Sequence, residues 1–139
     1  MPRTILLASF LQLSLFGLGQ QVKVTHKGPY AEMDKMIHDY GTIAKGADGI
    51  CHFTVTNTGD APLVISDCLS NCGCTVPVCP KEAIAPGAKA RVKVEYDTQR
   101  VGRINRSVTM MTNATNARQL QVLIKGEVTE GSAAPVVPK

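Results

Sequence analysis

The chain has 139 residues and a formal net charge of +4, from 15 Lys and Arg against 11 Asp and Glu. The basic residues form no run, and the aromatic residues are three Tyr and three Phe with no Trp. Nucleic-acid-binding proteins usually gather Lys and Arg into a stripe, often with aromatic side chains between them. The composition therefore indicates no nucleic-acid partner, and the excess positive charge is better explained as a contribution to solubility.

Residues 1–19 have the pattern of a signal peptide. Arg3 supplies a positive start, Ile5 to Leu18 are mostly apolar, and Gly17-Leu18-Gly19 offers small residues for cleavage before Gln20. The alternative is a membrane anchor, but the apolar run is shorter than the about 20 residues that a bilayer core requires. We therefore predict an exported protein with no membrane span after cleavage.

The rest of the chain, about 120 residues long, has the size of one domain. We expect a lead-in at residues 20–29, a folded domain at 30–129 and a tail at 130–139. The tail is rich in Ala, Pro and Val and is too short to bury a core, so we expect it to be disordered.

Short strands separated by turn residues follow from about Tyr30 onward. Turns are expected at 57–60, 85–87 and 113–116, where Gly, Pro, Asn and Asp gather. Between them, apolar and polar residues alternate with the period of a half-buried strand. No segment shows helical periodicity. The pattern predicts an all-β protein, a single immunoglobulin-like antiparallel β-sandwich of about seven strands. The predicted core-facing residues are Cys51, Phe53, Val55, Val92, Val94, Tyr96, Val108, Met110, Leu120, Val122 and Ile124.

Four of the five cysteines form a cluster, with the spacing C-x3-C-x-C-x4-C, in the expected loop after a strand that begins at Leu63. They are Cys68, Cys72, Cys74 and Cys79. Export to an oxidising compartment allows disulfides to form. Because five is an odd number, at least one thiol stays unpaired within the chain. Cys51 lies on an apolar strand face, so we expect it to be a buried thiol that acts as a small hydrophobic residue.

Three interpretations of the cluster remain open. Two structural disulfides would staple the loop and restrict the unfolded chain. Alternatively, Cys72-Gly73-Cys74 is a redox pair, with Gly73 allowing a tight bend and Lys81 favouring a thiolate. In the third interpretation, all four thiolates bind zinc or copper, which prefer soft ligands. The spacing lacks the paired C-x2-C motif of structural zinc sites, and oxidising conditions disfavour four thiolates, so we expect no metal and no cofactor.

The sequence offers little for conventional catalysis. Its three histidines, His26, His38 and His52, each have an ordinary surface or turn explanation. It contains no nucleophile-elbow pattern, no metalloprotease motif and no phosphate-binding glycine loop. We therefore identify no catalytic residues and no cofactor-binding residues, and a conventional enzyme is not expected.

A succession of short motifs resembles a bacterial exported family known as Domain of Unknown Function 1573. The motifs are His38-Asp39-Tyr40-Gly41-Thr42-Ile43, Phe53 to Leu63, Cys72-Gly73-Cys74-Thr75, Ile84-Ala85-Pro86-Gly87, Val94 to Gly102 and Ile124-Lys125-Gly126. The resemblance covers roughly Glu32 to Val128. It implies one sandwich, similar to the domains of pilus chaperones and of the ASH group, in the periplasm or cell envelope. The family has no established activity, so no functional residue is carried over.

The departures from the family pattern concern the cysteines. Cys72 and Cys74 belong to the pattern, whereas Cys51, Cys68 and Cys79 do not. The added bracketing pair favours a Cys68–Cys79 disulfide, which leaves Cys72 and Cys74 to pair with each other or to remain reactive.

Two functional hypotheses follow. The first is a non-enzymatic binding or structural module of the periplasm or envelope, which presents the stapled loop to an unknown protein partner. Sandwiches with exposed edge strands can accept a strand from such a partner. The alternative is a protein that handles thiols and disulfides, or copper or zinc, through Cys72 and Cys74.

Overall fold

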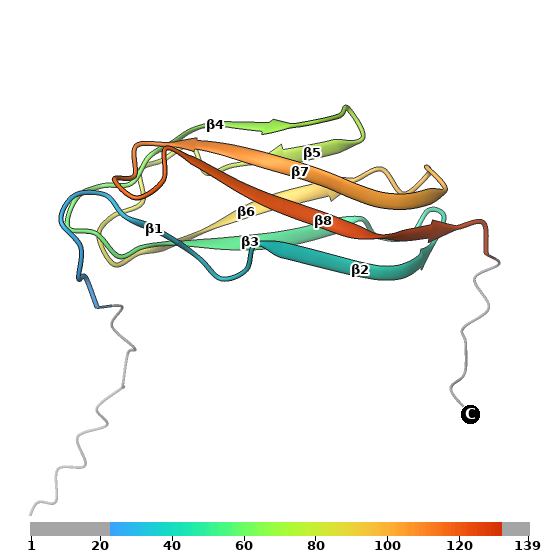
Figure 1. The fold of residues 1–139 in the computed structure, drawn as a ribbon, viewed down its shortest axis with the longest axis horizontal. Coiled ribbons are helices and arrows are strands. Elements are labelled where there is room, and N and C mark those ends of the chain that lie inside the picture. The colour runs from blue at the N-terminus through green and yellow to red at the C-terminus, as the bar shows by residue number, and fades with distance from the viewer. Residues whose placement is uncertain (1–22, 132–139) are drawn as a thin grey trace, which may run out of the picture.

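The computed structural model describes residues 23–131 and shows eight β-strands in two sheets packed face to face (Figure 1). One sheet has the order β1 (Ala31–Met33), β3 (Ile50–Asn57), β6 (Lys89–Tyr96) and β5 (Thr75–Val78). The other has the order β2 (Ile37–Ala44), β8 (Gln119–Thr129), β7 (Gly102–Thr112) and β4 (Ile65–Ser70). No helix, and hence no helix able to cross a membrane, occurs in residues 23–131. The prediction of an all-β sandwich is confirmed, with eight strands in place of about seven.

The core contains the residues that the alternation of apolar and polar residues in the sequence predicted to face inward. Phe53, Val55, Val92 and Val94 are completely buried between the sheets, whereas the residues between them along β3 and β6 face outward. The same holds for β7 and β8, where the remaining predicted core residues are buried. The strand periodicity therefore identified both the core and the outer surface of these four strands.

One pairing differs from the predicted antiparallel arrangement, because β2 runs parallel to β8. β1 pairs antiparallel with β3 in one sheet, and after a link of three residues the chain joins the opposite sheet as β2. Since the chain crosses between the sheets without reversing its direction, it meets β8 in parallel (Figure 1).

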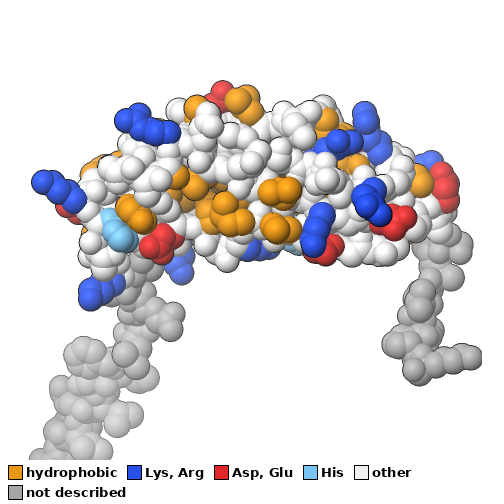
Figure 2. Space-filling view, viewed as in Figure 1, with side chains coloured by type: hydrophobic (Ala, Val, Ile, Leu, Met, Phe, Trp, Pro, Cys, Tyr) orange, Lys and Arg blue, Asp and Glu red, His pale blue; other side chains and the backbone are white. Residues whose placement is uncertain are grey.

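Strand β2 also inverts the usual hydrophobic pattern. Ile37 is exposed on the outer face opposite Leu123, whereas His38 and Tyr40 point toward the core and are partly buried. Figure 2 shows hydrophobic side chains gathered over this part of the sheet. A strand whose polar residues face inward lacks the apolar alternation of a half-buried strand, which explains why the sequence did not define β2.

The turn expected at residues 57–60 is present, but it does not depend on a left-handed backbone. No residue in this turn has a positive φ. Instead, Asn57 is a fully buried end of β3, and Gly59 is needed because a Cβ there would overlap the carbonyl oxygen of Gly28. The turn expected at residues 85–87 is also present, and there Gly87 has a φ of 79°.

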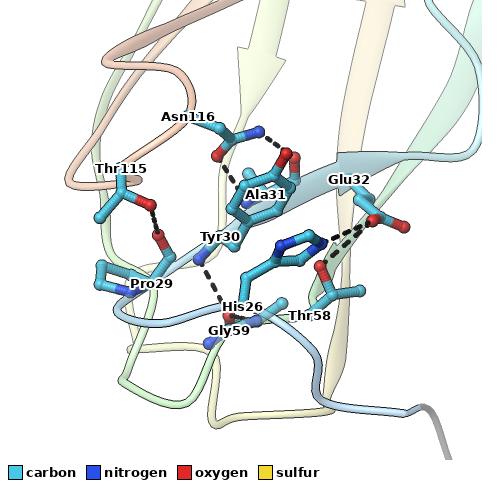
Figure 3. A network of polar contacts seen from close by, with 10 residues as sticks. His26, Pro29, Tyr30, Ala31, Glu32, Thr58, Gly59, Thr115 and Asn116 are labelled. Atoms are coloured by element: carbon cyan, nitrogen blue, oxygen red, sulfur yellow. Dashed lines mark hydrogen bonds and ion pairs between the residues drawn. The ribbon is translucent and has the colours of Figure 1, made fainter.

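The lead-in packs against the base of the sandwich, where His26 pairs with Gly59 as a β-bridge (Figure 3). The His26 ring stacks on Tyr30 with 3.6 Å between ring centroids, and its Nε2 lies 3.7 Å from Glu32. Asn116 exchanges two hydrogen bonds with the backbone of Ala31, of 3.0 and 2.9 Å. The described part of the lead-in is therefore attached to the domain. The predicted signal peptide at 1–19 and most of the predicted tail, from 132 onward, lie outside the described residues.

Candidate functional site

The clustered cysteines lie where the chain crosses from one sheet to the other at the β4–β5 side of the sandwich. Cys68 is within β4, and Cys79 directly follows β5. Their disulfide, with 6.2 Å between Cα atoms, joins the edge strands of the two sheets. The expected single loop is thus wrong, because residues 75–78 form a strand. We call β4, β5 and this disulfide the stapled edge.

A second disulfide joins Cys72 to Cys74 in the turn between β4 and β5, with 5.3 Å between Cα atoms. The Ser70 hydroxyl donates to the Cys72 carbonyl at 2.7 Å, and the Asp97 N–H donates to the Cys74 carbonyl at 2.8 Å. Gly73 has no positive φ, and a Cβ there would meet nothing within 4 Å. The turn therefore depends on these hydrogen bonds and the disulfide, and not on the expected conformational freedom of Gly73.

The two cysteines of this turn differ in residue exposure, and one hydroxyl lies close to both of their sulfurs. Cys74 is 2% exposed, whereas Cys72 is partly exposed. The hydroxyl of Thr75, itself buried, lies 3.6 Å from Cys72 Sγ and 3.7 Å from Cys74 Sγ. Thr75 is the residue that sequence reasoning missed. Its position directly after Cys74 in the Cys-Gly-Cys-Thr motif was the available signal.

Arg106 lies on β7 beside the same turn. Its Nε atom is buried and has no hydrogen-bond partner within the described part of the chain. Like Val108, it belongs to the inward-facing set of β7 residues. The Asn71 N–H donates to the Ser107 carbonyl at 3.3 Å, which continues the antiparallel register past the end of β4. Cys72 and Arg106 are the neighbours of this linked pair along the chain, one beside Asn71 and one beside Ser107.

Cys51 is the one free thiol of the described residues, and it lies apart from the cluster, on β3. It is buried, as predicted. Burial raises the pKa of the Cys51 thiol, while the Tyr40 hydroxyl and the charge of Lys35 lower it by smaller amounts. A protonated, buried thiol is unreactive, so Cys51 contributes packing and not chemistry.

The position of Lys81 and the state of the sulfurs bear on the redox and metal interpretations of the cluster. Lys81 is exposed beyond Cys79, so the four residues of β5, about 13 Å at the rise of a strand, separate it from the Cys72–Cys74 turn. A cysteine binds zinc or copper as a thiolate, whereas all four clustered sulfurs are in disulfides. In residues 23–131, no group of three or more His, Cys, Asp or Glu side chains could hold a metal ion.

The stapled edge carries much of the exposed apolar surface of the domain. Leu69 on β4 is 52% exposed, and Val76 and Val78 on β5 are 56% and 54% exposed. These are the three most exposed large hydrophobic side chains of the described residues. β4 pairs with β7 and β5 pairs with β6, so each strand leaves one side unpaired.

Comparison with known proteins finds one protein family that matches nearly the whole domain. Residues 31–128 match the family described as Protein of unknown function (DUF1573). No curated protein sequence matches the chain.

Solved structures that share the fold include the following three. A protein of unknown function from Porphyromonas gingivalis W83 is 17% identical with a TM-score of 0.66, over 81% of this chain and 51% of that one. This chain thus spans about half the length of that protein. The ASH/PapD-like domain 7 of human CEP192 is 8% identical with a TM-score of 0.62, over 95% and 99% of the two chains. The YadV chaperone is 9% identical with a TM-score of 0.52, over 73% and 54%.

Proposed function

This chain belongs to the DUF1573 family, and we propose that it is a binding module of the periplasm or cell envelope. Its stapled edge accepts an extended strand of a protein partner. The observation that carries the proposal is the coincidence of unpaired strand edges with the most exposed aliphatic side chains of the domain.

An exposed apolar edge strand is a liability that proteins usually cover or blunt. β5 is blunted, because it has four residues and includes Pro77, which has no N–H to donate. β4 has six residues and presents Leu69 on its outer face. We therefore assign β4 as the receiving edge, with Val76 and Val78 extending the apolar surface around the staple.

Strand addition derives affinity from main-chain hydrogen bonds and specificity from side chains that alternate along the added strand. The Cys68–Cys79 disulfide ties β4 to the opposite sheet, so the edge is held in place before the partner arrives. A preformed edge lowers the ordering cost of binding. The expected partner segment is extended and aliphatic.

Location in the periplasm or outside the cell is supported by two features. The described domain contains two disulfides, which persist in oxidising compartments. The pattern of residues 1–19 supports export through a cleaved signal peptide.

The test is photo-crosslinking in intact cells, with a photoreactive residue at position 69 or at position 123. Leu123 is a matched control, because it is an exposed aliphatic residue, 37% exposed, on a strand paired on both sides. A discrete crosslinked species from position 69 only, lost when Val76 and Val78 are changed to Lys, would support strand addition. Equal crosslinking from both positions would contradict it.

A further inference from the structure

We propose that Cys72 and Cys74 form a redox-active disulfide that exchanges with a pair of cysteine thiols on a protein substrate. This activity goes beyond binding and uses a turn that the receiving edge does not need. The partly exposed Cys72 is the sulfur that the substrate reaches, because Cys74 is only 2% exposed. The Thr75 hydroxyl lies close to both sulfurs, where it can donate a hydrogen bond to a thiolate formed in the exchange.

The exchange balances without any further reagent. A thiolate of the substrate attacks Cys72 Sγ, the Cys72–Cys74 bond breaks, and Cys74 leaves as a thiolate that takes up a proton. The second substrate thiolate then attacks the substrate's own sulfur in the mixed disulfide, and Cys72 leaves and takes up a proton. The substrate dithiol loses two electrons and two protons to become a disulfide, and the Cys72–Cys74 pair gains them.

Each step expels a thiolate, and the turn provides groups that stabilise one. The Thr75 hydroxyl lies at nearly the same distance from both sulfurs, 3.6 and 3.7 Å, so it can donate to whichever one leaves. Arg106, with its unpartnered buried Nε, precedes Ser107, whose carbonyl accepts from Asn71, the residue before Cys72. A nearby positive charge favours the thiolate form of a cysteine. Thr75 and Arg106 are therefore positioning residues of the exchange.

The other cysteines do not share this environment. Cys68 and Cys79 join two sheets across the edge of the sandwich, and the residues between them are held in β4, the turn and β5. Cys51 lies on β3, which β6 separates from β5. The proposal therefore predicts selective chemistry at one of the two disulfides.

Selectivity is tested on the oxidised full chain with a short reduced peptide that contains two cysteines. Quenching by alkylation and peptide mapping give the rate at which each cysteine is labelled. We expect Cys72 and Cys74 to be labelled at least about tenfold faster than Cys68 and Cys79. One peptide disulfide should form for each Cys72–Cys74 disulfide that is reduced. Equal rates for the two disulfides would overturn the proposal.

The order of attack is tested with two single variants and oxidised glutathione. Cys74→Ser leaves Cys72 as a free, partly exposed thiol, which should form a mixed disulfide rapidly. Cys72→Ser leaves the buried Cys74, which should react at least about tenfold more slowly because thiol exchange requires access. The reverse order would contradict the assignment of Cys72 as the attacked sulfur.

The roles of Thr75 and Arg106 are separated from structural effects by conservative variants. Thr75→Val should slow exchange by about tenfold, the value of a lost hydrogen bond to a charged group, whereas Thr75→Ser should restore it. Arg106→Gln should move the pH profile of Cys72 alkylation in the Cys74→Ser background to higher pH, and Arg106→Lys should move it less. The melting temperatures of the oxidised variants check that each one folds. If the variants lose exchange rate only in proportion to their loss of melting temperature, these roles are refuted.

Discussion

The buried side chain of Asn57 is expected to be worth more to stability than any other single polar group in the described domain. Its Nδ2 donates to the carbonyls of Ala61 and Ile84 at 2.8 and 2.9 Å. Its Oδ1 accepts from the N–H groups of Gly59 and Tyr30 at 3.0 and 3.3 Å. Since Asn57 is 0% exposed, one amide holds together the end of β3, the following turn, the lead-in and the segment before β6.

Replacing Asn57 with Ala removes all four bonds at once. The Gly59 N–H is left buried without a partner, which costs about 1–3 kcal/mol, and the Ile84 carbonyl keeps only its bond from the Leu63 N–H at 2.9 Å. The other two partners are partly buried, so water can replace some of the loss. We expect the free energy of unfolding to fall by about 3 kcal/mol, out of a typical total of about 5–15. For a domain of this size, that corresponds to a fall in melting temperature of roughly 12–24 °C.

Asn113→Ala is the matched control. Asn113 also accepts from a backbone N–H, of Val64 at 2.8 Å, and donates to a carbonyl, of Pro62 at 3.2 Å, but these bonds are exposed. Because water can take the place of the amide, the loss should stay below about 1 kcal/mol. Urea unfolding of both variants measures the difference. Similar losses for the two variants, or a loss below about 1 kcal/mol for Asn57→Ala, would refute the argument from burial.

Three further predictions concern the core, pH and processing. Val94→Asp buries a carboxylate between the sheets and should cost several kcal/mol, whereas Lys93→Asp on the outer face should be nearly neutral; comparable melting shifts would mean that the assigned register of β6 is wrong. Burial, and secondly the charge of Lys35, hold the pKa of His38 below its usual 6.5, so the unfolded chain takes up the proton first and stability is lost as pH falls below about 6.5. His38→Gln should flatten the slope of melting temperature between pH 7 and pH 5, and an unchanged slope would contradict this role. N-terminal sequencing of the exported protein should begin within a few residues of Gln20, and recovery of Met1 would instead indicate an anchor.

Some of the candidate site was accessible from the sequence and some was not. The unusual density of cysteines marked the region, and the departure of Cys68 and Cys79 from the family pattern favoured the pairing that the structure has. The sequence did not indicate that Cys68 and Cys79 face each other from different sheets. That relation depends on residues 75–78 forming β5 in the sheet opposite β4, and Pro77 concealed this strand.

The sequence by itself determined the fold class and the core. In β3, β6, β7 and β8 successive side chains alternate between the core and the solvent. The alternation of apolar and polar residues in the sequence therefore predicts which of them are buried. The buried state of Cys51 followed from the same periodicity.

The tertiary structure alone decided which elements meet. The parallel pairing of β2 with β8 results from a chain that changes sheets without turning back, and no local pattern encodes that crossing. Likewise, the sequence alone suggests an ordinary turn residue at Asn57, whereas in the structure other segments surround it and bond to it. Arg106 looks like a surface residue in the sequence, whereas the link between Asn71 and Ser107 brings its strand beside the Cys72–Cys74 turn. Local periodicity reports the environment of a side chain within its own strand, whereas a site depends on contacts between residues distant in sequence, which form only when the two sheets pack together.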